Sequence, residues 1–227
     1  MHVSSQLRHD QPTRHRHNPG DVLSSLAMTT RYGRGQEIYT QDHPAEHWYR
    51  VVSGAARRFT VQANGRRQIV DFLLPGDFFG LASRNVHLFA VEAIVEGTVV
   101  AAYPRERAEA LADANPHLGR DIRIVTAAEI ARLQTRILIL GRIGSLGKVS
   151  AFLLEMADRL SSRTQASKTG EGILLPMSRY DIADYLTLSV ETVSRALTSL
   201  KQRGAIKLVG TRRVKIIHYD ALEDSDE

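Results

Sequence analysis

Apolar and polar positions follow two different periods along the chain, and the change of period divides it into two kinds of structure. Between residues 31 and 103, short runs of aromatic and β-branched residues are separated by turn signals that contain glycine or proline. This pattern is typical of an antiparallel β-roll or barrel. Within it, Asn64-Gly65 predicts the turn of a β-hairpin, because this pair tolerates the positive φ angles that tight hairpin turns need.

The apolar spacing becomes helical from residue 115 onward. Between residues 115 and 140, apolar residues recur every three or four positions, the spacing of a coiled-coil seam. We expect this long helix to be a dimerisation helix, with packing onto its own domain as the alternative. The expected interface residues are Ile122, Val125, Ile130, Leu133, Ile137 and Leu140. Three glycines between residues 141 and 147 then predict a hinge, and residues 148–160 form another amphipathic pattern.

Residues 178–203 contain two helical patterns joined by a short turn. Ser178 and Asp181 have the spacing of a capping box, and Ser189 suits the N-cap of the second helix. The inward stripe of the second helix is Val193, Leu197 and Leu200, and its outer face carries Glu191, Ser194, Arg195 and Thr198. Such an outer face can hydrogen-bond to base edges in a major groove, whereas the simpler alternative is a solvated helix pair. Residues 206–217 predict two strands joined at Gly210, a wing.

The distribution of charge favours the first of these interpretations. The 227 residues carry a net charge of +5 and a pI near 9.7, and no acidic residue lies between Glu191 and Asp220. The basic residues in this region are Arg195, Lys201, Arg203, Lys207, Arg212, Arg213 and Lys215. A block of one sign favours a polyanionic partner such as DNA.

Other features of the composition exclude whole classes of function. The chain has no cysteine, which excludes cysteine-ligated iron–sulfur or zinc sites and thiol redox sensing. No apolar run is long enough to span a membrane and no secretory leader is present, so we expect a cytoplasmic protein. No nucleophile–base pair, metal-ligand cluster or phosphate-cradling glycine loop stands out, so we expect no enzyme. Residues 1–28 are expected to be a flexible tail. Its histidines (His2, His9, His15 and His17) are candidate metal or haem ligands, with an ordinary tail as the alternative.

The order of roll, long helix, hinge and winged helix-turn-helix, together with VETVSR and PGDFFG, resembles the CRP/FNR superfamily of bacterial transcription regulators. The resemblance covers about residues 30–219. It implies an α+β protein with an antiparallel β-roll similar to a cyclic-nucleotide-binding domain, a dimerisation helix and a C-terminal winged helix-turn-helix. The expected domain boundaries are a tail over 1–28, a roll over 29–114, a dimerisation helix and hinge over 115–147, and a DNA-binding domain over 148–227.

Within the superfamily, the run DIADYLTLSVETVSR and the absence of cysteine look most like the FixK branch. That likeness implies half-sites of the TTGAT type and a role in switching on genes of microoxic respiration, nitrogen fixation or denitrification. It also implies base readout by Val190, Glu191, Ser194 and Arg195, and phosphate contacts from Ser178, Tyr180, Ser189, Thr192 and Arg212.

The recognition positions also have physical reasons. Arg195 can donate to O6 and N7 of guanine, and Glu191 can accept from the N4 amine of the paired cytosine. Ser194 is small enough to approach a base edge. Val190, where the CRP type has arginine, suits a thymine methyl group. Thr187 occupies the turn position where many helix-turn-helix sequences carry glycine, which leaves the turn geometry open.

The roll departs from the cyclic-nucleotide-binding pattern. Leu81 falls where that pattern has the ribose-binding glutamate, and Leu88 and Phe89 fall where it has arginine and serine or threonine. A cyclic phosphate would lack a charge-assisted partner unless Arg84 compensated, so no cyclic nucleotide and no cofactor are expected.

The first hypothesis is therefore a homodimeric activator that needs no effector and recruits RNA polymerase, with the loop Ala82–His87 as one candidate contact patch. The alternative is a sensor gated by a nucleotide or by haem. His43, His47 and His87 are candidate haem ligands, with an ordinary surface or core histidine as the alternative for each.

Overall fold

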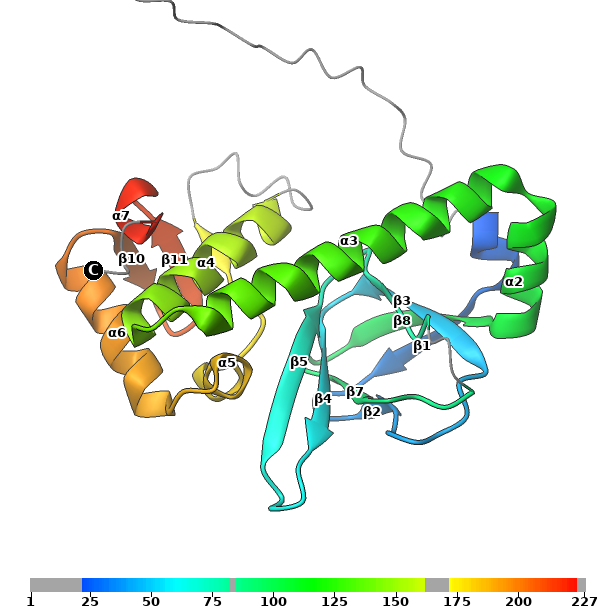
Figure 1. The fold of residues 1–227 in the computed structure, drawn as a ribbon, viewed down its shortest axis with the longest axis horizontal. Helices are drawn as coiled ribbons and strands as arrows, with labels where there is room; N and C mark the ends of the chain where they lie inside the picture. The colour runs from blue at the N-terminus through cyan, green and yellow to red at the C-terminus, as the bar shows by residue number, and fades with distance from the viewer. Residues whose placement is uncertain (1–21, 82–84, 162–171, 224–227) are drawn as a thin grey trace, which may run out of the picture.

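The computed structural model describes residues 22–81, 85–161 and 172–223. Figure 1 shows a β-roll at one end and a unit of helices with a small sheet at the other, with one long helix lying along both. The roll elements are η1 (Leu23–Leu26), β1 (Met28–Tyr32), β2 (Glu37–Tyr39), β3 (His47–Ser53), β4 (Ala56–Val61), β5 (Arg67–Leu73), β6 (Phe78–Phe79), β7 (Ala90–Ala93) and β8 (Thr98–Pro104). The remaining elements are α2 (Arg105–Ala114), α3 (Pro116–Gly141), α4 (Ser145–Ser161), β9 (Ile173–Leu174), α5 (Arg179–Leu186), α6 (Val190–Gln202), β10 (Ile206–Val209), β11 (Arg213–Ile216) and α7 (Asp220–Glu223).

Two antiparallel sheets form the roll, in the orders β1-β8-β3-β6 and β2-β7-β4-β5. Strands β4 and β5 are the predicted hairpin, and its turn is closed by a hydrogen bond of 2.9 Å from Gln62 N to Arg66 O. Gly65 lies there at φ +78°, which confirms the expected positive φ. A cluster of buried side chains fills the space between the sheets: Tyr39, Val51, Ala56, Leu73, Phe79, Val91 and Val100.

The folded chain begins earlier than the sequence predicts. Leu23 is fully buried beside Trp48, Phe78 and Tyr103, and β1 starts at Met28. The tail predicted to reach residue 28 is therefore too long. The apolar run around Leu23 is too short to show a period. Leu23 nevertheless packs with Ala108 of α2 and Leu118 of α3 at the end of the roll, and Val22 and Leu26 pack against the same cluster. The four tail histidines lie outside the described residues.

The helices after the roll confirm and extend the prediction. Helix α3 covers the expected long segment and begins with a good cap, because Asn115 Oδ1 accepts from the backbone N–H groups of His117 and Leu118. Helix α2 was not predicted. The expected hinge is shorter than the glycine pattern indicates, because α4 already begins at Ser145 and includes Gly147.

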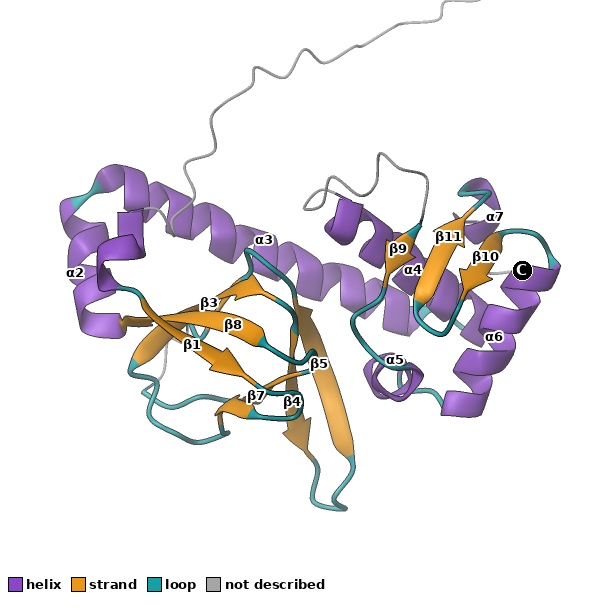
Figure 2. Cartoon of the chain, turned by 180° about the vertical axis from the view of Figure 1, so that it is seen from behind, coloured by secondary structure: helices purple, strands orange, loops and turns teal. Residues whose placement is uncertain are grey.

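The C-terminal unit packs α4, α5 and α6 against the small sheet β10-β11-β9, with β10 and β11 as the predicted wing. Figure 2 shows this sheet from the back, beside α6 and away from the roll. The turn of the wing is at Gly210, at φ +66°. The inward residues predicted for α4 (Val149, Phe152, Leu153 and Met156) are all buried.

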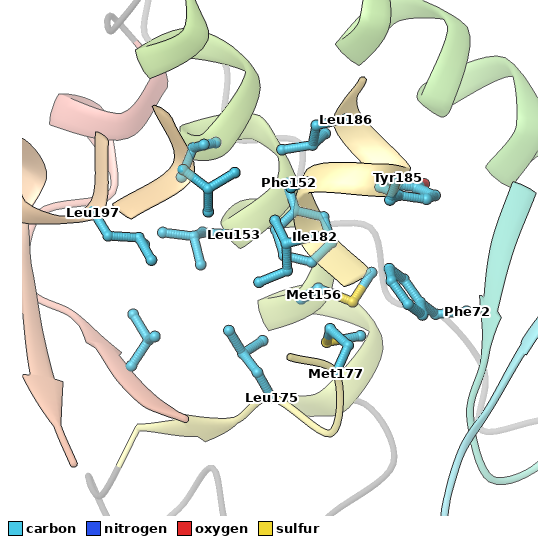
Figure 3. Packing of buried hydrophobic residues seen from close by; sticks show 14 of the residues in the cluster. Phe72, Phe152, Leu153, Met156, Leu175, Met177, Ile182, Tyr185, Leu186 and Leu197 are labelled. Atoms are coloured by element: carbon cyan, nitrogen blue, oxygen red, sulfur yellow. The ribbon is translucent and has the colours of Figure 1, made fainter. Parts of the chain in front are cut away.

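One hydrophobic cluster crosses from the roll into the C-terminal unit. Phe72 of β5 lies 5.1 Å from the ring of Tyr185 of α5 and 6.3 Å from Phe152 of α4, measured between ring centroids. Figure 3 shows Phe72 beside Tyr185, with Met156 close by. The two units therefore share part of their core, so the position of the helix pair relative to the roll is set by packing as well as by the chain connection.

Ion pairs close the edge of this shared core. Arg57 of β4 pairs with Asp181 of α5, and Arg67 of β5 lies 3.2 Å from Asp184. Glu92 of β7 pairs with both arginines. We call Arg57, Arg67, Glu92, Asp181 and Asp184 the interdomain clamp. Breaking a buried pair by removing one partner is costly because the other charge stays desolvated, so the clamp holds the helix pair on the roll.

Candidate nucleic-acid interface

The first helix of the pair starts with the predicted capping box. The Ser178 hydroxyl accepts from Asp181 N at 3.2 Å, and Ser178 N donates to Asp181 Oδ2 at 2.8 Å. The capping carboxylate is also the one that Arg57 binds in the interdomain clamp. Asp181 therefore stabilises the start of α5 in two ways, through the capping box within the helix and through an ion pair with the roll.

The turn between the two helices uses a left-handed residue. Thr187 ends α5 at φ +57° and ψ +43°, and Leu188 N donates to Ala183 O at 3.0 Å. Ser189 then caps α6, because its hydroxyl accepts from Thr192 N at 3.1 Å. The doubt about Thr187 is thus resolved. The turn has the αL geometry that glycine usually supplies, with threonine in its place.

Helix α6 presents the expected two faces. Val193, Leu197 and Leu200 are buried, whereas Glu191, Arg195 and Thr198 are exposed and Ser194 is half-buried. Val190 is half-buried and packs against the core, so only part of its side chain could meet a base.

Electrostatics keep the exposed Glu191 ionised. Its pKa lies below its ordinary value, first because the carboxylate accepts from its own backbone N–H and then because it accepts from the Ser189 hydroxyl, with a smaller effect of Arg195. An ionised acceptor and a forked donor therefore stand one turn apart on the outer face, the combination that can read a cytosine and a guanine.

One residue beside the recognition set was missed in the sequence. Arg179, the first residue of α5, donates from Nη1 to Ser194 Oγ at 3.2 Å. In the sequence, Arg179 lies between Ser178 and Tyr180, two predicted phosphate contacts. Neighbouring residues do not indicate that its side chain reaches Ser194 on α6. Arg179 therefore fixes the Ser194 hydroxyl and adds a cation to the outer face.

The predicted phosphate contacts differ in how many of their hydrogen-bond donors already have a partner within the protein. Tyr180 is 69% exposed. The hydroxyls of Ser189 and Thr192 are bound to each other at 2.9 Å, and the Ser178 hydroxyl donates to Asp181 Oδ2 at 2.7 Å. Arg212 uses one guanidinium nitrogen on the carbonyl of Pro176, at 3.2 Å.

The ligand positions of the roll are apolar in the structure as well as in the sequence. Leu81 and Phe89 are half-buried and Leu88 is 48% exposed; Arg84 lies outside the described residues. Among the described residues, no group of three or more His, Asp or Glu side chains is arranged to hold a metal ion.

The candidate haem ligands of the roll occupy ordinary surface and core positions, and one of them, His87, also belongs to the candidate contact patch. His87 is buried and stacks on Tyr39 at 3.7 Å between ring centroids, while His43 is exposed and His47 half-buried. The expectation that the loop Ala82–His87 forms a surface patch is therefore wrong for His87, because its ring is buried in a stack on Tyr39. Residues 82–84 lie outside the described residues.

Helix α3 leaves an apolar strip uncovered within one chain. Ile130 is 53% and Ile137 68% exposed. Ile122 and Val125 instead pack partly against the roll. Leu133 and Leu140 are half-buried, and Ile124 and Leu138 are further exposed residues that the seam pattern did not include.

Comparison with known proteins agrees with this architecture. Residues 29–115 match the model of the cyclic nucleotide-binding domain, and residues 147–225 match that of the Crp-like helix-turn-helix domain. In the described part of the chain, no helix is both long and apolar enough to cross a membrane.

Two relatives and one solved structure are similar to this chain, and all three are FixK-type proteins. The chain is 40% identical to the nitrogen fixation regulation protein FixK of Azorhizobium caulinodans, over 92% of this chain and 83% of that protein. It is 36% identical to FixK of Rhizobium meliloti, over 88% of each. The structure of FixK2 from Bradyrhizobium japonicum aligns with a TM-score of 0.80 and 39% identity, over 89% of this chain and 98% of that one. The chain therefore belongs to the CRP/FNR superfamily of DNA-binding transcription activators, as a regulator of the FixK type.

Proposed function

We propose that the chain acts as a homodimer that binds a palindrome of the TTGAT-N4-ATCAA type and recruits RNA polymerase. The observation that carries this proposal is the outer face of α6, where Glu191 and Arg195 are exposed one turn apart on a firmly capped helix. An arginine that donates to guanine and a carboxylate that accepts from the paired cytosine would read one base pair completely. A dimer would place two such helices in successive major grooves.

We further propose that this activity needs no small-molecule effector. The roll interior is filled by its own apolar cluster, and Leu81, Leu88 and Phe89 offer no charged partner to a cyclic phosphate. The interdomain clamp already holds the helix pair in place in the chain alone. The target genes are proposed to include nitrogen fixation genes, as the names of the two FixK relatives indicate for those proteins, and genes of microoxic respiration or denitrification. An exposed part of the roll, including Asn85, would face RNA polymerase.

Selection of bound sequences from a random duplex pool tests the proposal directly. We expect TTGAT half-sites without any added ligand. Arg195→Ala should reduce discrimination against a duplex with the guanine replaced by roughly fivefold to 150-fold, because about 1–3 kcal/mol of base readout is lost. Lys201→Ala, an exposed cation in the last turn of α6, is the matched control and should weaken both duplexes equally. A folded dimer that binds the palindrome no better than a scrambled duplex would contradict the proposal.

A further inference from the structure

One side chain of α3, that of Arg136, contacts both the roll and the C-terminal unit. Its Nη2 donates to the Ile69 carbonyl of β5 at 2.5 Å and to the Tyr185 carbonyl of α5 at 3.3 Å. The guanidinium also lies over the ring of Tyr185, with Cζ 4.7 Å from the ring centroid. A planar guanidinium can donate in its plane and stack on an aromatic ring at the same time. Arg136 therefore joins the long helix to the roll and to the first helix of the pair.

The carbonyl groups at the end of α5 find their partners outside that helix. The last carbonyls of an α-helix have no donor within the helix, and cations are favoured at that end. Gln68 of β5 donates from Nε2 to Asp184 O at 2.8 Å, and Arg136 donates to the next carbonyl, that of Tyr185. Side chains of the roll and of α3 thus cap the C-terminal end of α5.

This capped end lies directly before α6. The turn at Thr187 leads from Tyr185 to Ser189, the N-cap of α6. The turn has a fixed αL geometry, and the buried faces of α5 and α6 belong to one hydrophobic cluster. A shift of Tyr185 relative to α3 would therefore move α6 with it.

The same turn of α3 also carries part of the proposed dimer seam. Arg136 is half-buried against its own chain, whereas the next residue, Ile137, is 68% exposed. Two copies of α3 that pair through Ile130 and Ile137 would each hold their own α5 through Arg136. The separation and orientation of the two α6 helices would then depend on how α5 is held on α3.

We propose that Arg136 is a positioning residue that sets the half-site spacing accepted by the dimer. The side chains of α6 read the bases, whereas the accepted spacing depends on where the two α6 helices stand relative to each other. One added base pair moves the second half-site by about 3.4 Å and rotates it by roughly 35°, so a rigid link between α3 and α5 would disfavour it. This inference rests on the proposed function, since it needs a dimer that binds two half-sites.

Spacer length provides the test. We would measure the affinity of the full chain for three duplexes: the TTGAT-N4-ATCAA palindrome, the same palindrome with a spacer one base pair longer, and the palindrome with the guanine of each half-site replaced. Arg136→Met keeps the apolar stem and removes the guanidinium. It should lower the preference for the N4 spacer roughly threefold to tenfold, the effect of about one hydrogen bond. Its preference for the guanine should equal that of the wild type, because the outer face of α6 is unchanged.

Arg132→Met is the matched control. Arg132 lies one turn earlier on the same face of α3, but its carboxylate partners, Asp71 and Asp77, both belong to the roll. This variant should keep both preferences of the wild type. Arg136→Lys should show an intermediate spacer preference, because an ammonium group can donate to a carbonyl but lacks the planar fork that stacks on Tyr185. Sedimentation equilibrium and circular dichroism would identify the variants that form folded dimers.

A wild-type spacer preference in the folded dimer of Arg136→Met, or of Arg136→Lys where the first variant does not fold, would overturn the inference. An equal loss of spacer and guanine preference would also overturn it, since Arg136 would then maintain the fold of the helix pair without setting its position. The same holds if Arg132→Met lowers the spacer preference as much as Arg136→Met does. Failure of the proposed function looks different: the wild type would then bind the palindrome no better than a scrambled duplex.

Discussion

Thr187 ends α5 in the left-handed region at φ +57°, where a β-branched residue is strained. Replacing it with glycine removes the clash of Cβ with the backbone, which costs about 1–2 kcal/mol, but adds freedom to the unfolded chain. Thr187→Gly should therefore raise the free energy of unfolding by about 0.5–1 kcal/mol in urea titrations. Thr198→Gly, inside α6, should instead lower it by about 0.3–0.5 kcal/mol, the difference in helix propensity between the two residues. A destabilised Thr187→Gly would mean that the threonine side chain stabilises the turn.

His87 is a titratable group inside the roll. Burial lowers its pKa, and the charges of His43, Arg105 and His47 lower it further. Its Nε2 is buried without a hydrogen-bond partner among the described residues. The folded state therefore resists protonation of His87, whereas the unfolded chain takes up the proton near the ordinary value of about 6.5.

The resulting pH dependence has a definite sign. The contribution of His87 to stability is fully present above pH 6.5 or so and is lost as the pH falls below that value. His87→Phe keeps a ring against Tyr39 and removes the titration, so its free energy of unfolding should fall less steeply between pH 7 and 5 than that of the wild type. Urea titrations at several pH values measure this difference. The same slope in both proteins would assign the loss to other groups, among them His43 and His47.

At the scale of elements, the sequence was sufficient wherever a pattern was local. The hairpin turn at Asn64-Gly65, the capping box at Ser178 and the wing turn at Gly210 each depend on residues a few positions apart. Helix α2 was missed because RERAEALADA buries only Ala108 and carries a weak apolar stripe. Arg179 was missed for a related reason, since its partner Ser194 lies on another helix.

We predict that two exposed isoleucines of helix α3 form the dimer interface. Ile130 and Ile137 lie seven residues apart and are exposed in the single chain, so a second copy of α3 would cover them at coiled-coil spacing. Asp at both positions should shift the protein from dimer to monomer in sedimentation equilibrium, because paired carboxylates cannot be desolvated in an apolar seam. Affinity for the palindrome should fall with it, since two half-sites need two subunits.

The control for this experiment is another exposed position on the same helix. Ala128 lies on the opposite side of α3 from Ile130 by the helical period, and Ala128→Asp should leave the dimer intact. Unchanged circular dichroism in all variants would show that the helix still forms. If the doubly substituted protein still sediments as a dimer, the interface lies elsewhere, for example along Ile124 and Leu138.

At the scale of the whole molecule, the link between the roll and the helix pair could not be predicted from local patterns. Arg57 and Asp181 are separated by 124 positions, and Phe72 meets Tyr185 across the same boundary. The glycine pattern predicts a boundary between two units at the hinge, whereas one hydrophobic cluster contains buried residues from both units. We therefore expect the two units to unfold together in the wild type, with tryptophan fluorescence and helical circular dichroism following one transition. The single tryptophan, Trp48, reports on the roll.

Removing one arginine of the interdomain clamp should separate these transitions. Arg57→Met leaves Asp181, which is almost fully buried, and Glu92 without one of their cations, at a cost of roughly 3 kcal/mol. The cost falls on the contact between the C-terminal unit and the roll. The helical circular dichroism signal should therefore have its unfolding midpoint at a lower urea concentration than the Trp48 fluorescence signal. Arg66→Met, on the exposed hairpin tip, should leave the two curves superimposed. If Arg57→Met also unfolds in a single transition at the wild-type midpoint, the shared apolar core alone holds the helix pair on the roll, and the clamp contributes nothing to docking.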